Sequence, residues 1–169
     1  MINLGGNNLS SSFPKFFAKF SHLSSLDLGR CGLYGEIPQK ILQFSNLVNL
    51  DLEYNSLEGS IPSSLFALPQ LKSIYLSNNK FSGQLNMSPS AQLEEVDLSN
   101  NYLEGSFYLN DVIQHLGNLS FLDLSYNNFS IDVESSVSAS YNFPTLYSIN
   151  LASCRLNSFP KFLANLSKL

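Results

Sequence analysis

The stretch Leu47-Val48-Asn49-Leu50-Asp51-Leu52-Glu53-Tyr54-Asn55-Ser56-Leu57 contains the pattern on which the whole chain is built. Counted from Leu47, apolar residues stand at positions +3, +5 and +10, and an asparagine stands at +8. The pattern recurs every 22 to 27 residues, with anchors at Leu23, Leu47, Leu71, Leu93, Leu119, Leu146 and Leu169. One more copy, with its anchor just before Met1, puts Ile2 and Leu4 at +3 and +5. A period of this length predicts one structural unit per copy, each stacked on the next.

Each column of the pattern has a structural reason. Apolar residues at +3 and +5 are two apart, which is the period of a strand with one buried face, so stacked copies form a parallel sheet. At +8 the chain turns away from the strand, and buried backbone groups there need partners. The amide of Asn donates and accepts hydrogen bonds, and the thiol of Cys is a small, weak donor. We therefore expect a side-chain ladder from the +8 residues, which are Asn7, Cys31, Asn55, Asn79, Asn101, Asn127 and Cys154.

Proline marks the second half of the copies. The segments Gly35-Glu36-Ile37-Pro38 and Gly59-Ser60-Ile61-Pro62 follow the +10 leucine at the same offset. Phe13-Pro14 and Phe159-Pro160 take the matching place in two other copies. Since proline cannot donate to a central sheet ladder, we expect an edge strand or turn that begins the return on the convex side.

The columns match the L-x-x-L-x-L-x-x-N/C-x-L pattern, and the chain is identified on it as a member of the leucine-rich-repeat family. The longer phrase L-x-x-L-x-L-D-L-S-x-N-x-L-x-G-x-I-P resembles the plant-specific class of these repeats. The resemblance implies an α/β repeat solenoid that winds as a right-handed superhelix. Its parallel β-sheet lines the concave face, and short strands, turns and 3-10 or helical segments form the convex face. We expect residues 1–169 to form one domain of about seven repeats, truncated at both ends.

Several phrases narrow the resemblance further. Phe16-Phe17-Ala18-Lys19-Phe20-Ser21-His22-Leu23, Leu28-Gly29-Arg30-Cys31-Gly32-Leu33-Tyr34-Gly35 and Leu151-Ala152-Ser153-Cys154 look like plant receptor-like proteins, and most of all like the verticillium wilt resistance group. This resemblance implies a plasma-membrane receptor with an extracellular solenoid, one membrane span and a short tail without a kinase. It implies recognition of a pathogen- or host-derived ligand and signalling through a co-receptor kinase. Because no signal peptide, paired-Cys cap or membrane span is visible, we expect a fragment of such an ectodomain.

Two other functions stay open at this stage. One is a secreted leucine-rich-repeat inhibitor of a cell-wall-degrading hydrolase, similar to the polygalacturonase inhibitors, although that class has Cys-rich caps. The other is an intracellular scaffold with the same fold. The sequences that flank Met1 and Leu169 in the gene would separate the three.

The solvent side of the predicted sheet is the candidate binding surface, because solenoids usually bind along it. Positions +1, +2, +4, +6 and +7 hold seven of the 13 acidic residues but only two basic ones. Exposed aromatic residues supply anchors and acids supply selectivity, so a peptide or protein ligand with basic groups fits this side. The candidates are Arg30, Glu53, Tyr54, Lys72, Tyr75, Glu94, Glu95, Phe121, Tyr126 and Tyr147. For the +4 aspartates, which are Asp27, Asp51, Asp97 and Asp123, orientation of the neighbouring turns is the competing role.

Two segments and five motifs lie outside the repeat columns. The two longer copies carry extra residues after the strand, which include Tyr108–Gln114 and Asp132–Tyr141, and the serine-rich run Ser135–Ser140 predicts a flexible loop on the convex side. N-glycosylation sequons occur at Asn8, Asn86, Asn118, Asn128 and Asn165. They fit an extracellular protein, although a chain so rich in Asn and Ser acquires several by chance.

Charge and composition exclude other functions. The net charge of −4 argues against a nucleic-acid partner, and the longest apolar runs fall short of the roughly 18 residues of a membrane span. We expect no direct membrane contact from this segment. Cys31 and Cys154 are five repeats apart, about 24 Å, so we expect two buried thiols and no disulfide. Clustered metal ligands, a phosphate loop and a Ser-His-carboxylate set are lacking, which predicts no metal, no cofactor and no enzyme activity.

Overall fold

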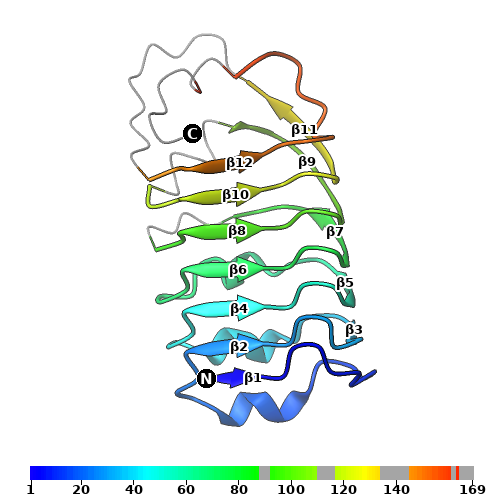
Figure 1. Ribbon diagram of the computed structural model, residues 1–169, viewed down its shortest axis with the longest axis vertical. Coiled ribbons are helices and arrows are strands. Elements are labelled where there is room, and N and C mark those ends of the chain that lie inside the picture. The colour runs from blue at the N-terminus through cyan, green and yellow to red at the C-terminus, as the bar shows by residue number, and fades with distance from the viewer. Residues whose placement is uncertain (88–91, 110–116, 134–144, 161–162, 164–169) are drawn as a thin grey trace.

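The computed structural model describes residues 1–87, 92–109, 117–133, 145–160 and 163. Its main feature is a seven-stranded parallel sheet that turns its solvent side toward the viewer in Figure 1. The strands follow each other in chain order, one per repeat, so the predicted solenoid is confirmed. They are β1 (Ile2–Asn3), β2 (Ser25–Asp27), β4 (Asn49–Asp51), β6 (Ser73–Tyr75), β8 (Glu95–Asp97), β10 (Phe121–Asp123) and β12 (Ser148–Asn150).

The six strands after β1 cover positions +2 to +4, and β1 covers +3 and +4. Equal positions pair across the sheet. Leu26 pairs with Leu50, and Leu50 pairs with Ile74. The +3 residues therefore form one buried row, while the +2 and +4 side chains alternate to the solvent side. Leu28 and Leu52, at +5, are fully buried beneath the turn that follows.

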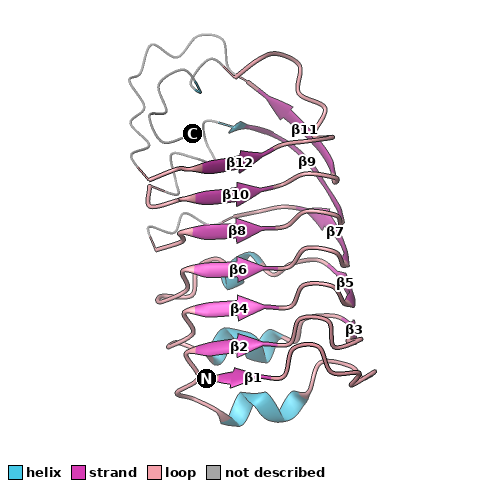
Figure 2. Ribbon diagram, viewed as in Figure 1, coloured by secondary structure: helices cyan, strands magenta, loops and turns pink. Residues whose placement is uncertain are grey.

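A second parallel sheet runs along the right-hand edge of Figure 1, as the magenta arrows of Figure 2 show. Short strands were expected on this side, but not a continuous sheet. The strands lengthen along the chain, from two residues in β3 to seven in β9. They are β3 (Tyr34–Gly35), β5 (Ser56–Gly59), β7 (Lys80–Gln84), β9 (Tyr102–Tyr108) and β11 (Asn128–Asp132).

Glycine makes the second sheet possible. Gly59 pairs with the buried Phe81, and Gly83 pairs with the buried Leu103 of the next repeat. Both glycines have φ near +80°, a left-handed conformation that side chains with a Cβ seldom adopt. The glycine two positions after the +10 residue therefore lets the chain bend back over the core.

Three short 3-10 helices each begin directly after a proline. They lie behind the main sheet in Figure 1 and are cyan in Figure 2. They are η1 (Lys15–Lys19), η2 (Gln39–Gln43) and η3 (Ser63–Leu65), and their preceding residues are Pro14, Pro38 and Pro62. The predicted start of the convex return at proline is confirmed. Phe17, Phe44 and Phe66 pack from this side into the leucine core.

The extra residues of the two longer repeats begin within the second sheet. Tyr108 and Asp132 are the last residues of β9 and β11, and they pair with each other. The second sheet therefore extends beyond the repeat pattern, and the predicted loop at Ser135–Ser140 lies outside the described residues. Most of the remainder of both segments lies outside the described residues.

The predicted ladder at +8 is present, and it joins each repeat to the one before. Asn101, which is 6% exposed, donates from Nδ2 to the carbonyls of Leu98 and Ser99 in its own repeat, both at 3.1 Å. The same amide donates to Leu76 O of the preceding repeat at 3.0 Å, and Oδ1 accepts the Phe81 N–H at 3.0 Å. Asn55, Asn79 and Asn127 make the same set of bonds.

Cysteine fills the ladder position differently. Cys31 Sγ donates to Leu4 O at 3.0 Å, and Cys154 Sγ donates to Leu124 O at 3.3 Å. A thiol offers no amide oxygen, so the Leu9 N–H donates to the Cys31 backbone carbonyl instead, at 2.9 Å. Both cysteines are buried and unbridged, as predicted, and burial raises the pKa of the Cys154 thiol to about 11.

Removal of one ladder amide is expected to weaken the stack. Asn101→Ala leaves the Phe81 N–H and three carbonyls without their partner, and we expect a loss of about 3 kcal/mol in the free energy of unfolding. Asn101→Cys keeps a donor and should lose less. Urea unfolding measures both. The control Asn100→Gly changes the neighbouring exposed residue, whose φ of 53° suits glycine, and should cost little. Equal losses for Asn101→Ala and Asn100→Gly would contradict the ladder's role.

Candidate ligand-binding face

We call the solvent side of the seven-stranded sheet, made of positions +1, +2, +4, +6 and +7, the sheet face. The strand pairing aligns these positions from repeat to repeat, so each forms a row across the strands. No helix or loop of the described residues covers the middle of this face in Figure 1.

The +4 row has a structural role in six of its seven members. The side-chain Oδ1 of each accepts the backbone N–H two residues later, at 2.9 to 3.2 Å. The six are Asn3, Asp27, Asp51, Asp97, Asp123 and Asn150. Orientation of the turns, the competing role for the aspartates, is therefore present. Each of these bonds uses Oδ1. The other carboxylate oxygen, Oδ2, accepts no hydrogen bond at Asp27, Asp51 and Asp97 within the described part of the chain.

The +7 row lies in the left-handed region of backbone conformation. Its φ values include 57° at Arg30, 52° at Tyr54 and 54° at Tyr126. Asn78 and Asn100 occupy the same position at 56° and 53°, and asparagine tolerates this conformation well. Arginine and tyrosine do not, so their presence at three +7 positions carries a backbone cost. All three side chains are exposed.

At one end of the sheet face, Arg30 joins two other candidates. Its guanidinium Cζ lies 3.9 Å from the centroid of the Tyr54 ring, and its Nη2 lies 3.7 Å from Glu53 Oε1. A cation over an aromatic ring and beside a carboxylate is held by both contacts. Tyr54 keeps 46% of its surface exposed.

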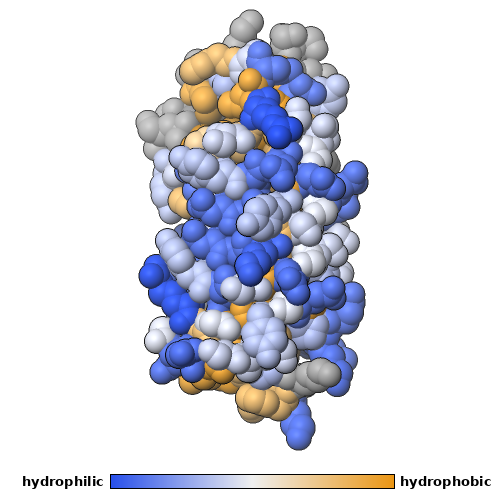
Figure 3. Space-filling view, turned by 90° about the vertical axis from the view of Figure 1, so that its right-hand side faces the viewer, coloured by the Kyte–Doolittle hydropathy of each residue, from blue (hydrophilic) through white to orange (hydrophobic). Residues whose placement is uncertain are grey.

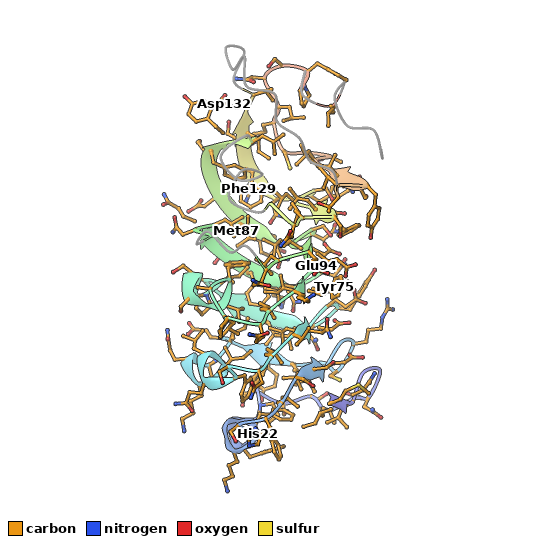
Figure 4. The ribbon with its side chains drawn as sticks, turned by 90° about the vertical axis from the view of Figure 1, so that its left-hand side faces the viewer. His22, Tyr75, Met87, Glu94, Phe129 and Asp132 are labelled. Carbon is orange, nitrogen blue, oxygen red and sulfur yellow. The ribbon has the colours of Figure 1, made fainter. Side chains whose placement is uncertain are left out.

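The middle and far parts of the face hold three more pairs. Lys72 Nζ lies 2.7 Å from Glu94 Oε1, and the Tyr75 hydroxyl donates to Glu95. Figure 4 shows Tyr75 and Glu94 close together on the sheet-face side of the molecule. Burial, with the Glu95 hydrogen bond second, raises the pKa of Tyr75 above its usual value. The last pair is Phe121 and Tyr147, whose ring centroids are 6.5 Å apart.

Nine of the ten predicted candidates are thus in contact with another candidate. Tyr126 is the remaining one, and it is exposed without a side-chain bond to the other nine in the described part of the chain. One exception in the +4 row is visible in the sequence, because Tyr75 is the only member of that row that is neither Asp nor Asn. The left-handed +7 row was missed, since only Gly6, Asn78 and Asn100 in that row signal such a conformation.

Charge on the sheet face is strongly one-sided. It carries seven acidic and two basic residues, a net −5, whereas the rest of the chain has six acidic and seven basic residues, a net +1. Both bases are already paired, with Glu53 and Glu94. Burial raises the pKa of Asp51, and the charges of Asp27 and Asp97 raise it further. The charge of Arg30 opposes part of this rise at Asp51, although the guanidinium is paired with Glu53.

A shallow depression of about 280 Å³ lies at the β1 end of the sheet face. Its lining is polar, and glycines at +6 keep it open. A Cβ at Gly29 would lie 3.1 Å from Asp51 Oδ1, and one at Gly5 would lie 2.8 Å from Asp27 Oδ1. The remaining lining residues are Asn3, Gly6, Arg30 and Glu53.

The predicted glycosylation sites lie away from the sheet face. Asn8, Asn86, Asn118 and Asn128 are exposed, and none occupies a sheet-face position. Asn165 lies outside the described residues. Within the described ranges, no three His, Cys, Asp or Glu side chains are grouped as a metal site would require, and no helix has the length and apolar character of a membrane span.

Family models of the leucine-rich repeat match residues 34–81, 92–116 and 118–139. The chain belongs to the leucine-rich-repeat family. Its fold is typical of binding proteins rather than of enzymes. A search of curated proteins gave no match.

Several solved plant receptor ectodomains are similar in structure. The plant peptide hormone receptor RGFR1 in complex with RGF2 is 29% identical, with a TM-score of 0.85 over 99% of this chain and 27% of that one. The Arabidopsis receptor kinase HAESA, in complex with the peptide hormone IDA and the co-receptor SERK1, is 30% identical, with a TM-score of 0.81 over 98% and 27%. The ectodomain of the receptor kinase SOBIR1 from Arabidopsis thaliana is 30% identical, with a TM-score of 0.67 over 75% and 71%. The chain spans about a quarter of the first two.

Neutralisation of one aspartate should stabilise the leucine-rich-repeat chain at neutral pH. The raised pKa of Asp51 means that the folded state holds this proton more tightly, so its contribution to stability falls as pH rises through the folded pKa. Asp51→Asn keeps the Oδ1 cap, as Asn3 and Asn150 do, and removes the charge. We expect a gain of at most about 1 kcal/mol at pH 7, because the carboxyl is partly exposed, and a smaller gain near pH 4.

Thermal unfolding at the two pH values measures this effect. Glu104→Gln removes the same charge from the second sheet and should give no comparable gain. A destabilised Asp51→Asn at pH 7 would show that the carboxylate is held by favourable interactions instead.

Proposed function

We propose that the chain is a ligand-binding segment of the extracellular solenoid of a plant cell-surface receptor-like protein. Its sheet face binds a peptide or protein ligand with basic groups. In the full-length protein, at the outer side of the plasma membrane, a co-receptor kinase passes on the signal. Pathogen recognition and defence, as in the verticillium wilt resistance group, form the finer part of the proposal and rest on the phrases around Arg30 and Cys154.

The observation that carries the proposal is the uncovered sheet face with a net charge of −5. Exposed aromatic side chains lie at both ends of this acidic surface, at Tyr54 and at Tyr126 and Tyr147. Aromatic anchors with surrounding charges are the composition of a recognition surface. The side of the second sheet, shown in Figure 3, is largely hydrophilic, and all residues outside the sheet face together have a net charge of only +1.

The structural relatives support the class of ligand. RGFR1 is in complex with RGF2, and HAESA is in complex with the peptide hormone IDA and the co-receptor SERK1. This chain is similar in structure to such ectodomains over almost its whole length, which supports a peptide or protein as its ligand. The similarity does not identify the ligand of this chain, because surface residues determine which ligand binds and the shared core does not.

Loss of the aromatic anchors should abolish binding at the sheet face. We expect Tyr54→Ala, Tyr126→Ala and Tyr147→Ala, combined in one variant, to weaken binding of a pool of random basic nonapeptides by at least about tenfold. The peptides are acetylated and amidated, and fluorescence anisotropy measures the binding. Tyr34→Ala, Tyr102→Ala and Tyr108→Ala, combined, form the control, because these tyrosines are 48 to 59% exposed on the second sheet.

The comparison of the two variants decides the outcome. Both remove three exposed tyrosines and leave the charge unchanged, so a loss confined to the first variant supports the sheet face. Equal binding by both variants and the unmodified chain would contradict the proposed function.

The receptor assignment has its own test. We expect the gene to encode a signal peptide upstream of residue 1 and a membrane span with a short tail downstream of residue 169. The genomic sequence on both sides, confirmed on the transcript, shows whether they are present. A Cys-capped secreted end would favour the hydrolase inhibitor, and the lack of both signals would favour the scaffold.

A further inference from the structure

The fourth repeat lacks the +4 side-chain cap that the other six repeats have. At +4, where Asp or Asn caps the following turn, it has Tyr75, whose side chain cannot reach back to accept the Ser77 N–H. Ser77 is 2% exposed, and in the described part of the chain its N–H has no acceptor. A buried N–H without a partner costs stability. The ring at this position therefore replaces a local stabilising bond.

Two carboxylates flank this ring. Strand pairing places Tyr75 directly between Asp51 and Asp97, each one strand away at about 4.8 Å. Each aspartate uses Oδ1 for its own turn, and its Oδ2 accepts no hydrogen bond within the described residues. The nearest bases of the sheet face, Arg30 and Lys72, are held by Glu53 and Glu94.

The chain itself shows what such a combination binds. One repeat away, the Arg30 guanidinium lies over the Tyr54 ring and beside the Glu53 carboxylate. The site at Tyr75 has the same two components, an aromatic ring and carboxylates, without a guanidinium. A planar guanidinium stacks on an aromatic face and bonds to carboxylate oxygens at the same time, which an ammonium does less well.

We propose that the ligand inserts an arginine side chain between Asp51 and Asp97, with its guanidinium stacked on Tyr75. This inference rests on the proposed function, since it names the side chain that the sheet face recognises. The Tyr75 hydroxyl, bonded to Glu95, holds the ring against the sheet. An arginine here would reduce the repulsion between the carboxylates, which Arg30 relieves only in part at Asp51.

The substitution Tyr75→Asp separates this subsite from general attraction. It restores the missing cap and makes the sheet face more acidic, so the variant should fold at least as stably, which its thermal midpoint checks. If acidity alone attracts the ligand, binding rises. If the ring is required, binding falls by about tenfold. Tyr34→Asp makes the same substitution at an exposed tyrosine of the second sheet and serves as the matched control, with binding expected within about twofold.

The probes are three pools of acetylated, amidated nonapeptides without acidic residues, each with Arg, Lys or Gln fixed at the central position. We expect the order Arg, Lys, Gln for the unmodified chain, and loss of the Arg preference in Tyr75→Asp and in the combined Asp51→Asn and Asp97→Asn variant. Binding that depends on Tyr54, Tyr126 and Tyr147 but is unchanged or stronger in Tyr75→Asp would overturn the arginine subsite alone. Binding that no sheet-face substitution alters would overturn the proposed function as well.

Discussion

The hydrogen bonds of the +8 side chain are the constraint on which the rest of the structure depends. Asn101 bonds to Leu98 and Ser99 in its own repeat and to Leu76 and Phe81 in the preceding one. It therefore closes its own turn and fixes the step to its neighbour with the same amide. Because this step is fixed, equal positions align across the strands, and the leucines at +3 and +5 stack into one core. The rows of the sheet face follow from the same alignment.

That alignment gives the +4 aspartates two roles. Asp51 and Asp97 each hold a turn with Oδ1, which is an internal requirement of the repeat. The second oxygen remains on the surface, so the fold itself creates a row of negative charge. Asparagine would hold the turn equally well, as Asn3 and Asn150 show, without the charge. At Asp123 the second oxygen accepts a hydrogen bond from Asn150 Nδ2, which an asparagine could not do. The turns do not require a carboxylate at Asp27, Asp51 and Asp97, and the proposed basic ligand would give these three charges a role.

Repetition made most of the fold predictable from the sequence. The columns at +3, +5, +8 and +10 predicted the main sheet, the core and the ladder, because each column is a single environment sampled seven times. The second sheet was not predicted as such, since its register steps from Gly59 to Phe81 and depends on left-handed glycines rather than on an alternating pattern. On the sheet face, the candidates were visible as exposed positions. Their pairing was not, because the contact of Arg30 with Tyr54 joins residues a full repeat apart and depends on side-chain conformation.

The departures from the repeat are more informative about function than the repeat itself. Asn78 and Asn100 show the unstrained solution at +7, yet Arg30, Tyr54 and Tyr126 occupy that position with the same positive φ. Tyr75 likewise replaces a cap. Such local costs persist where another requirement outweighs them. These residues extend from β2 to β10, four strand steps or about 19 Å, which an extended segment of about six residues spans. A ligand that uses all of them therefore runs across the strands, with Tyr75 at its centre.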